Sequence, residues 1–284
     1  MDHTNKYIST TVLPDLTPID NSLRILTNAG YFNIELGSTH PNEENVEDIL
    51  VKYKANFLVH NYFPTPKLEL IVNVCSNDEV IREKSINHVE KRIIFSKNIN
   101  AGLYTFHPGY ISQPISTNKD NSNWDFVYQP AINSSVDYDK AFGLLVEAVN
   151  KFIEVAEKLH QPIAIETSGS FTKKDHLLMQ RAFEFEKLFS EVDSKYLGVN
   201  LNLGHLNLAS RAFSFDRFEF IETIKDKIFA FEVSHNDRVN DDHAMLRHGE
   251  WYSEIINNPI FENIPMIYEG RNTHLVDIDT LWNV

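Results

Sequence analysis

The stretch GVNLN, residues 198–202, is a short apolar run that ends in a polar side chain. Runs of four to eight Val, Ile, Leu, Phe or Tyr residues are typical of strands that are buried on both faces. Eight such runs occur along the chain, and they end at Thr10–Thr11, Glu35, His60, His107, Glu166, Asn202, His235 and Glu269. Most of the intervening stretches are long enough for a crossover helix. The pattern predicts the α/β class and a single (β/α)8 TIM barrel, whose active site lies at the C-terminal ends of the strands.

The expected elements follow from the apolar runs and from helical spacing between them. We expect strands at Tyr7–Val12, Phe32–Leu36, Phe57–His60, Leu103–Phe106, Ile163–Ile165, Gly198–Leu201, Ile228–Val233 and Met266–Tyr268. We expect helices over Ser22–Asn28, Val46–Tyr53, Asp78–Lys97, Asp139–Leu159 and Asp175–Phe189. Asp78 is of a type that caps helix N-termini. The stretch Tyr110–Asp137 is rich in Ser, Asn and Gln and follows a strand end, which indicates a lid or an ordered loop.

Length and composition restrict the class of protein. The chain has 284 residues and a formal charge of −14, so we expect one domain over residues 1–284 and no broad surface for nucleic acid. No apolar stretch reaches the ~20 residues of a membrane span, and the N-terminus carries no basic-then-apolar signal. The single cysteine, Cys75, cannot form an internal disulfide. A reducing, cytoplasmic location fits that composition.

Imidazoles and carboxylates recur at the expected strand ends. Five of the 12 histidines lie at or just beyond these ends, namely His60, His107, His205, His235 and His243. Three carboxylates join them there: Glu166, Asp241 and Glu269. Such a mixture of ligands suits zinc, manganese or iron better than calcium or magnesium. For any one of these histidines the alternative is a hydrogen-bonded structural role, but the recurrence strand by strand favours a metal site.

Two local spacings support this interpretation. Asn202 and His205 lie three residues apart, so both can face one centre on the first turn that follows the sixth strand. Asp241 and His243 alternate, so in an extended loop their side chains point to the same side. The alternative for the second pair is a solvated acidic turn.

Several segments together resemble one family. They are HNYFPTP, LIVNVCSNDEVIREKSI, TFHPG, IAIETSG, GVNLNLGHLNLA, FEVSHND, DDH and YEGR. In this order they resemble the endonuclease IV and xylose-isomerase-like barrel superfamily. The resemblance to its DNA-repair branch implies up to three zinc ions, held by His60, His107, Glu166, Asn202, His205, His235, Asp241, His243 and Glu269. The resemblance to its sugar branch implies one divalent ion near Glu166, Asn202, His235 and Glu269.

Two departures from the family pattern bear on function. The family usually has aspartate at the position of Asn202, and an amide carries no charge to neutralise a metal, so fewer or more weakly bound ions are expected. The loop after the second strand, residues 37–41 (GSTHP), lacks the arginine that the repair enzymes insert into DNA. With the acidic charge, this favours a small carbohydrate substrate over nucleic acid.

The resemblance implies a metal-dependent isomerase or epimerase of a sugar or sugar phosphate, with Zn or Mn as the expected ion. Glu166 and Glu269 would exchange a proton through an enediolate, and Glu35, His205 and Arg271 would contact the substrate. One alternative is zinc-dependent hydrolysis of abasic DNA, which the REKS stretch at residues 82–85 favours. The other is a degenerate barrel that binds a sugar without converting it. The sequence leaves the oligomeric state open.

Overall fold

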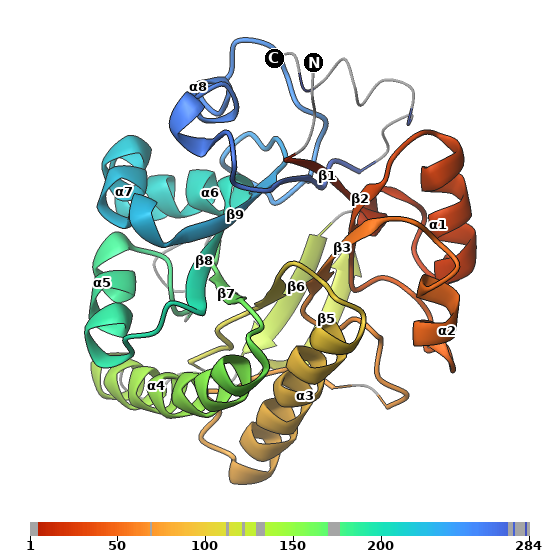
Figure 1. Cartoon of the computed structure of the whole chain (residues 1–284). Helices are drawn as coiled ribbons and strands as arrows, with labels where there is room; N and C mark the ends of the chain where they lie inside the picture. Colours follow the sequence, from red (N-terminus) through yellow and green to blue (C-terminus); the bar gives the residue numbers. More distant parts are fainter. Residues whose placement is uncertain are drawn as a thin grey trace.

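The computed structural model describes residues 5–68, 70–111, 114–120, 123–128, 134–169, 177–271, 275 and 282. Eight parallel strands close into a barrel in the order β1-β10-β9-β8-β7-β4-β3-β2, with helices around the outside (Figure 1). The strands are β1 (Lys6–Ser9), β2 (Asn33–Leu36), β3 (Asn56–His60), β4 (Tyr104–Phe106), β7 (Ile163–Glu166), β8 (Leu197–Asn202), β9 (Ile228–Val233) and β10 (Met266–Tyr268). The chain therefore folds as a (β/α)8 TIM barrel, which confirms the predicted fold class.

The helices alternate with the strands as expected. They are α1 (Ile19–Asn28), α2 (Val46–Leu50), α3 (Glu79–Asn98), α4 (Ser134–Leu159), α5 (Ala182–Glu191), α6 (Leu203–Phe213), α7 (Arg217–Ile224) and α8 (Ser253–Ile256). Short 3-10 turns cover Thr10–Val12, Lys225–Lys227 and Pro259–Phe261. The predicted cap is confirmed, because the Asp78 carboxylate accepts hydrogen bonds from the N–H groups of Val80 (2.8 Å) and Ile81 (3.2 Å). None of the helices in the described part of the chain combines the length and apolar character that a membrane span requires.

Two segments differ in their bounds from the sequence-based expectations. The first strand ends at Ser9 rather than Val12, because the Ser9 hydroxyl accepts the N–H of Thr11 and begins a 3-10 turn. The helix expected from residue 175 begins at Ala182, and its start is fixed by Glu184, whose carboxylate accepts the N–H groups of residues 180 and 181. Residues 170–176 lie outside the described part.

The stretch expected to form a lid or an ordered loop contains an antiparallel hairpin. Its strands are β5 (Pro114–Asp120) and β6 (Asn123–Tyr128), and α4 already begins at Ser134. The hairpin follows β4, so it belongs to the connections at the C-terminal end of the barrel. β5 (PISTNKD) is polar and carries little apolar alternation, but Trp124, Phe126 and Tyr128 alternate along β6 and are a strand signal that the sequence analysis did not use.

The interior of the barrel is apolar at one level and polar at the next. Side chains alternate between the two faces of a strand, so every second residue points inward. The inward layer formed by Leu58, Leu103, Ala164, Ala230 and Ile267 is buried and apolar. Two residues further along β3, β7, β9 and β10, at the C-terminal ends, come His60, Glu166, Glu232 and Glu269. The apolar layer thus supports a polar layer at the mouth of the barrel.

Candidate metal centre

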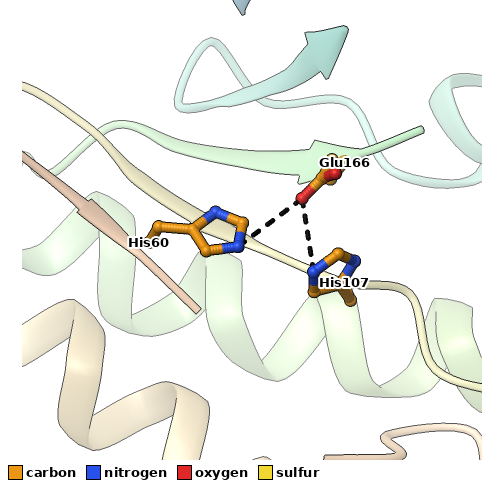
Figure 2. A group of neighbouring side chains, drawn as sticks. All are labelled: His60, His107 and Glu166. Atoms are coloured by element: carbon orange, nitrogen blue, oxygen red, sulfur yellow. Dashed lines mark ion pairs between the residues drawn. The ribbon is translucent and has the colours of Figure 1, made fainter. Parts of the chain in front are cut away.

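The first group of possible metal ligands consists of His60, His107 and Glu166, at the ends of the neighbouring strands β3, β4 and β7 (Figure 2). Oε2 of Glu166 lies 3.4 Å from Nε2 of His107 and 3.8 Å from Nε2 of His60. The Glu166 side chain is only 1% exposed, and its Oε2 accepts no hydrogen bond from the described residues. This carboxylate oxygen is buried, accepts no hydrogen bond from the described residues and points toward two imidazoles. A cation bound between them would give the oxygen a partner.

The donor set fits a metal ion in its spacing as well. Zinc bonds to nitrogen and oxygen are about 2.0–2.2 Å long, which places neighbouring ligands of a tetrahedral ion roughly 3.3 Å apart. The other ring nitrogen of His60, Nδ1, lies 2.9 Å from Oγ1 of Thr105 and 3.3 Å from Oε1 of Glu232. Partners of this kind fix the ring orientation of a ligating histidine and leave Nε2 available.

The second group consists of His205, Asp241 and His243. Oδ2 of Asp241 lies 3.1 Å from Nε2 of His205 and 3.3 Å from Nε2 of His243. The two groups are adjacent, because Nδ1 of His205 lies 3.0 Å from Oε1 of Glu166. Glu269 lies on the far side of the second group, with Oε2 3.6 Å from Nδ1 of His243.

A helix start and a loop position the second group. His205 lies on the first turn of α6, where its Nδ1 is 2.8 Å from the carbonyl oxygen of Thr167. Gly169 allows this approach, because a Cβ at that position would lie 2.9 Å from Cα of His205. Asp241 and His243 belong to the loop after β9, where Nε2 of His243 and Oδ2 of Asp241 lie within 3.3 Å although the backbone of His243 is left-handed (φ 44°) rather than extended.

Asn202 faces two carboxylates with its amide N–H2 group. Its Nδ2 donates to Oε2 of Glu232 at 2.8 Å and to Oε1 of Glu166 at 3.2 Å. Its Oδ1 accepts the backbone N–H of His205 at 3.1 Å and so caps α6. The structure thus differs from the expectation of a ligand oxygen, since the oxygen caps a helix and the nitrogen faces the site.

Glu232 is a site residue that the sequence analysis missed. It is 1% exposed, and its Oε1 accepts a 2.5 Å hydrogen bond from Nδ2 of Asn200. It also forms a third group of possible ligands with Glu35 and His60. Glu35 accepts a 2.8 Å hydrogen bond from Ser9. The available signal was a carboxylate inside the otherwise apolar run IFAFEV, residues 228–233.

One predicted ligand, His235, stands apart from these groups, whereas Arg271 lies beside the second group. Among the described residues, no group of three possible ligands includes His235, whose Nδ1 lies 3.3 Å from the hydroxyl of Tyr252. The alternation of β9 explains the separation, because Glu232 points inward and a residue three positions later points away. Arg271 follows β10, and its backbone N–H donates to the carbonyl oxygen of His243 at 2.7 Å.

Burial and neighbouring charges shift the pKa values in the site. Although burial disfavours its charged form, the imidazoles of His107 and His205 hold the pKa of Glu166 well below its usual range. Burial lowers the pKa of His107. Burial, with the nearby carboxylates of Glu232 and Glu35, raises the pKa of Glu269 well above its usual range. The pKa of Glu166 is thus lowered and that of Glu269 raised, as in sites where one carboxyl group acts as a base and another as an acid.

Comparisons with known proteins agree with this architecture. The chain is 24% identical over 198 residues to an uncharacterized protein of Methanocaldococcus jannaschii, an alignment that covers 70% of this chain and 57% of that one. It is 26% identical over 202 residues to a protein of Petrotoga mobilis named a probable endonuclease 4, covering 64% of this chain and 67% of that one. A solved D-tagatose 3-epimerase-like protein superposes with a TM-score of 0.74 at 16% identity, over 98% of this chain and 94% of that one.

At this low identity the superposition establishes a common fold. A family model described as a xylose isomerase-like TIM barrel matches residues 23–280. That match covers nearly the whole barrel, including every residue of the two ligand groups. The chain belongs to the xylose isomerase-like TIM barrel family.

Proposed function

We propose that this chain is a divalent-metal-dependent enzyme that hydrolyses a phosphate ester of a small, carbohydrate-like substrate. The observation that carries the proposal is the pair of adjacent groups, each with two imidazoles and one carboxylate. One group is His60, His107 and Glu166, and the other is His205, Asp241 and His243. The resemblance to the sugar branch implies one ion, whereas two adjacent ions are typical of enzymes that cleave phosphate esters.

The residues would divide the work as follows. His60, His107 and Glu166 would hold one ion, and the second group would hold the other. When bound, such ions would polarise a phosphoryl oxygen and would lower the pKa of water, the nucleophile that would displace the ester oxygen from phosphorus. Burial and the carboxylates of Glu232 and Glu35 raise the pKa of Glu269, which favours its protonated form, and a protonated carboxyl group at this place would donate to the leaving oxygen.

The substrate would be a small molecule rather than DNA. The formal charge of −14 disfavours a polyanion, and residues 37–41 (GSTHP) offer no arginine to a bent duplex. The relative from Petrotoga mobilis is named as an endonuclease, which supports phosphoester chemistry without fixing the size of the substrate. We therefore propose that nucleic acid is not a substrate of this chain.

A second candidate is the isomerase or epimerase that the sequence analysis favoured. Glu166 and Glu269 both lie at the mouth of the barrel, joined through His205, Asp241 and His243. Two carboxylates with pKa values shifted in opposite directions suit a proton transfer across a substrate. The superposition on an epimerase-like protein supports the same reaction class.

One experiment separates the two candidates. The protein, loaded with Zn²⁺ or Mn²⁺, is incubated with a panel of sugar phosphates, free ketoses in D2O, and an abasic-site duplex. We expect release of inorganic phosphate, no deuterium in the sugars and no cut DNA. Deuterium at the carbon next to the carbonyl group, without phosphate release, would establish the second candidate instead. Inactivity on the whole panel with metal bound would favour a non-catalytic barrel.

We also propose that residues 1–284 act as one domain and that the protein works in the cytoplasm. The single cysteine, Cys75, is free and buried, as is usual where thiols stay reduced.

A further inference from the structure

The amide of Asn202 lies between two buried carboxylates that belong to different parts of the site. Its Nδ2 is 3.2 Å from Oε1 of Glu166 and 2.8 Å from Oε2 of Glu232. All three side chains are buried, with 1% of each residue exposed. Glu166 is also a member of the first ligand group, so the amide lies at the edge of a candidate metal site.

The hydrogen bonds fix which way the amide points. Two carboxylate oxygens can only accept, so they require the N–H2 group on their side. The backbone N–H of His205 can only donate, and it requires the amide oxygen at 3.1 Å. Rotating the amide by half a turn would break all three contacts at once. Asn202 is therefore held with its positive end toward Glu166 and Glu232.

Glu232 is satisfied without a cation. It accepts hydrogen bonds from the amides of Asn202 and Asn200, and its Oε1 lies 3.3 Å from Nδ1 of His60. A dication placed between Glu166 and Glu232 would meet the positive end of the Asn202 amide instead of a third oxygen.

We propose that the Asn202 amide takes the place of a cation between Glu166 and Glu232, so that the chain binds one ion in the first group (His60, His107, Glu166), one in the second (His205, Asp241, His243), and excludes a third ion from beside Glu232. The inference rests on the proposed function only in that both ligand groups bind metal. The ion count, however, is measured without any substrate, so it can fail or succeed independently of phosphate release.

Asn200 provides a matched control. It lies on the same strand two residues earlier, points to the same side, is buried, and also donates to Glu232. Among the described residues, the hydrogen bond to Glu166 is made by the side chain of Asn202 and not by that of Asn200. Asn200→Asp thus replaces a donor to Glu232 and leaves the Asn202 amide between Glu166 and Glu232, whereas Asn202→Asp removes that amide and places a carboxylate there.

The experiment counts ions per chain. Wild type, Asn202→Asp and Asn200→Asp are purified, stripped with a chelator, reloaded with Zn²⁺, desalted and analysed by mass spectrometry for zinc and by amino-acid analysis for protein. We expect two ions for wild type, three for Asn202→Asp and two for Asn200→Asp. The third ion should also appear as a further Zn²⁺-dependent rise in melting temperature that Asn200→Asp lacks.

Three ions in wild type would overturn the proposal, because the amide would then not exclude a cation. Equal counts in the two variants would overturn it as well, since the position between Glu166 and Glu232 would have no special affinity. Should Asn202→Asp fail to fold without metal, refolding in the presence of Zn²⁺ supplies the protein for the count, and the wild-type count still decides. Two ions in wild type without phosphate release would leave this inference intact and reject the proposed reaction.

Discussion

The two ligand groups are built from different kinds of structure. His60, His107 and Glu166 stand at the ends of three strands that pair with one another in the barrel, and Glu166 is 1% exposed. In the second group, His205 lies on a helix and Asp241 on a loop, so the groups differ in the elements that hold them rather than in exposure, since the His107 side chain is 32% exposed and that of Asp241 22%. The ligands of the first group lie at the ends of barrel strands, whereas Asp241 and His243 of the second group lie on the loop that follows β9.

This difference predicts unequal roles for the two groups. Strand ends are held by the barrel hydrogen bonds and by the apolar layer beneath them, so the first group is ordered before any ion binds. The loop of the second group is held by its pairing of His235 with Ala244, 2.9 and 2.8 Å, and by the contact of Arg271 N–H with His243. Function often lies in such loops on a rigid scaffold. We therefore expect the first group to bind metal more tightly than the second.

The largest effect should come from Glu166→Gln. The change keeps the shape but removes the charge of the first group, and it weakens the contact with His205 that joins the groups. We expect turnover to fall by roughly 10²–10⁴-fold or to disappear, with the fold intact. Steady-state kinetics, zinc content and circular dichroism provide the three measurements. Near-normal activity would show that the first group is not part of the active site.

Asp241→Asn should have the next largest effect. It removes the only carboxylate of the second group, so the second ion should be lost at low zinc concentration while the first stays. We expect turnover to fall by at least about 10²-fold, the size typical of losing one charge-stabilising group. Activity should recover partly as zinc is raised, which Glu166→Gln should not do. Loss of both ions together would show that the groups are one cooperative site and that the comparison above is wrong.

Glu269→Gln distinguishes the two candidate reactions. If the chain hydrolyses a phosphate ester, Glu269 supplies only the proton for the leaving oxygen, and the loss should be roughly 10²-fold, the lower end for a general acid. If the chain is an isomerase, Glu269 moves the proton itself, and turnover should vanish as with Glu166→Gln. Parallel assays of the two variants on the same substrate decide between these outcomes.

The sequence predicted the barrel and most of the site because both depend on alternation along strands. Apolar runs located all eight barrel strands, and the residues at their ends located His60, His107 and Glu166. Glu232 was missed because it lies inside a run rather than at its end. His235 was included because it stands directly after that run, although its side chain belongs to the other face and contacts Tyr252.

The remaining differences depend on contacts that are distant in the sequence. The direction of the Asn202 amide follows from Glu166 and Glu232, which lie 36 and 30 residues away. The adjacency of the two ligand groups follows from the contact between Glu166 and His205. Neither can be derived from spacing, since both depend on how β7, β8 and β9 are registered in the closed barrel.

The smallest effect concerns stability and the strand end that carries His60. His88 of α3 is buried, and its Nε2 lies 3.2 Å from the carbonyl oxygen of Asn61, which also accepts the hydroxyl of Tyr104 at 3.1 Å. Burial, with the charge of Arg92, lowers the pKa of His88 from about 6.5 to about 4. The folded state thus keeps this imidazole neutral at pH values where the unfolded chain protonates it.

The sign of the pH dependence follows from that difference. Above about pH 6.5 the ring is neutral in both states. As the pH falls from about 6.5 to about 4, the unfolded chain binds a proton at His88 that the folded chain does not bind. His88 should therefore reduce the free energy of unfolding over this interval by up to about 3 kcal/mol. In His88→Gln, which keeps an N–H donor, urea unfolding at pH 7, 6, 5 and 4 should show a shallower decline. An unchanged slope would mean that His88 titrates normally. The strand end beside His60 would then be open to water, and the first ligand group would not be held more rigidly by the barrel than the second.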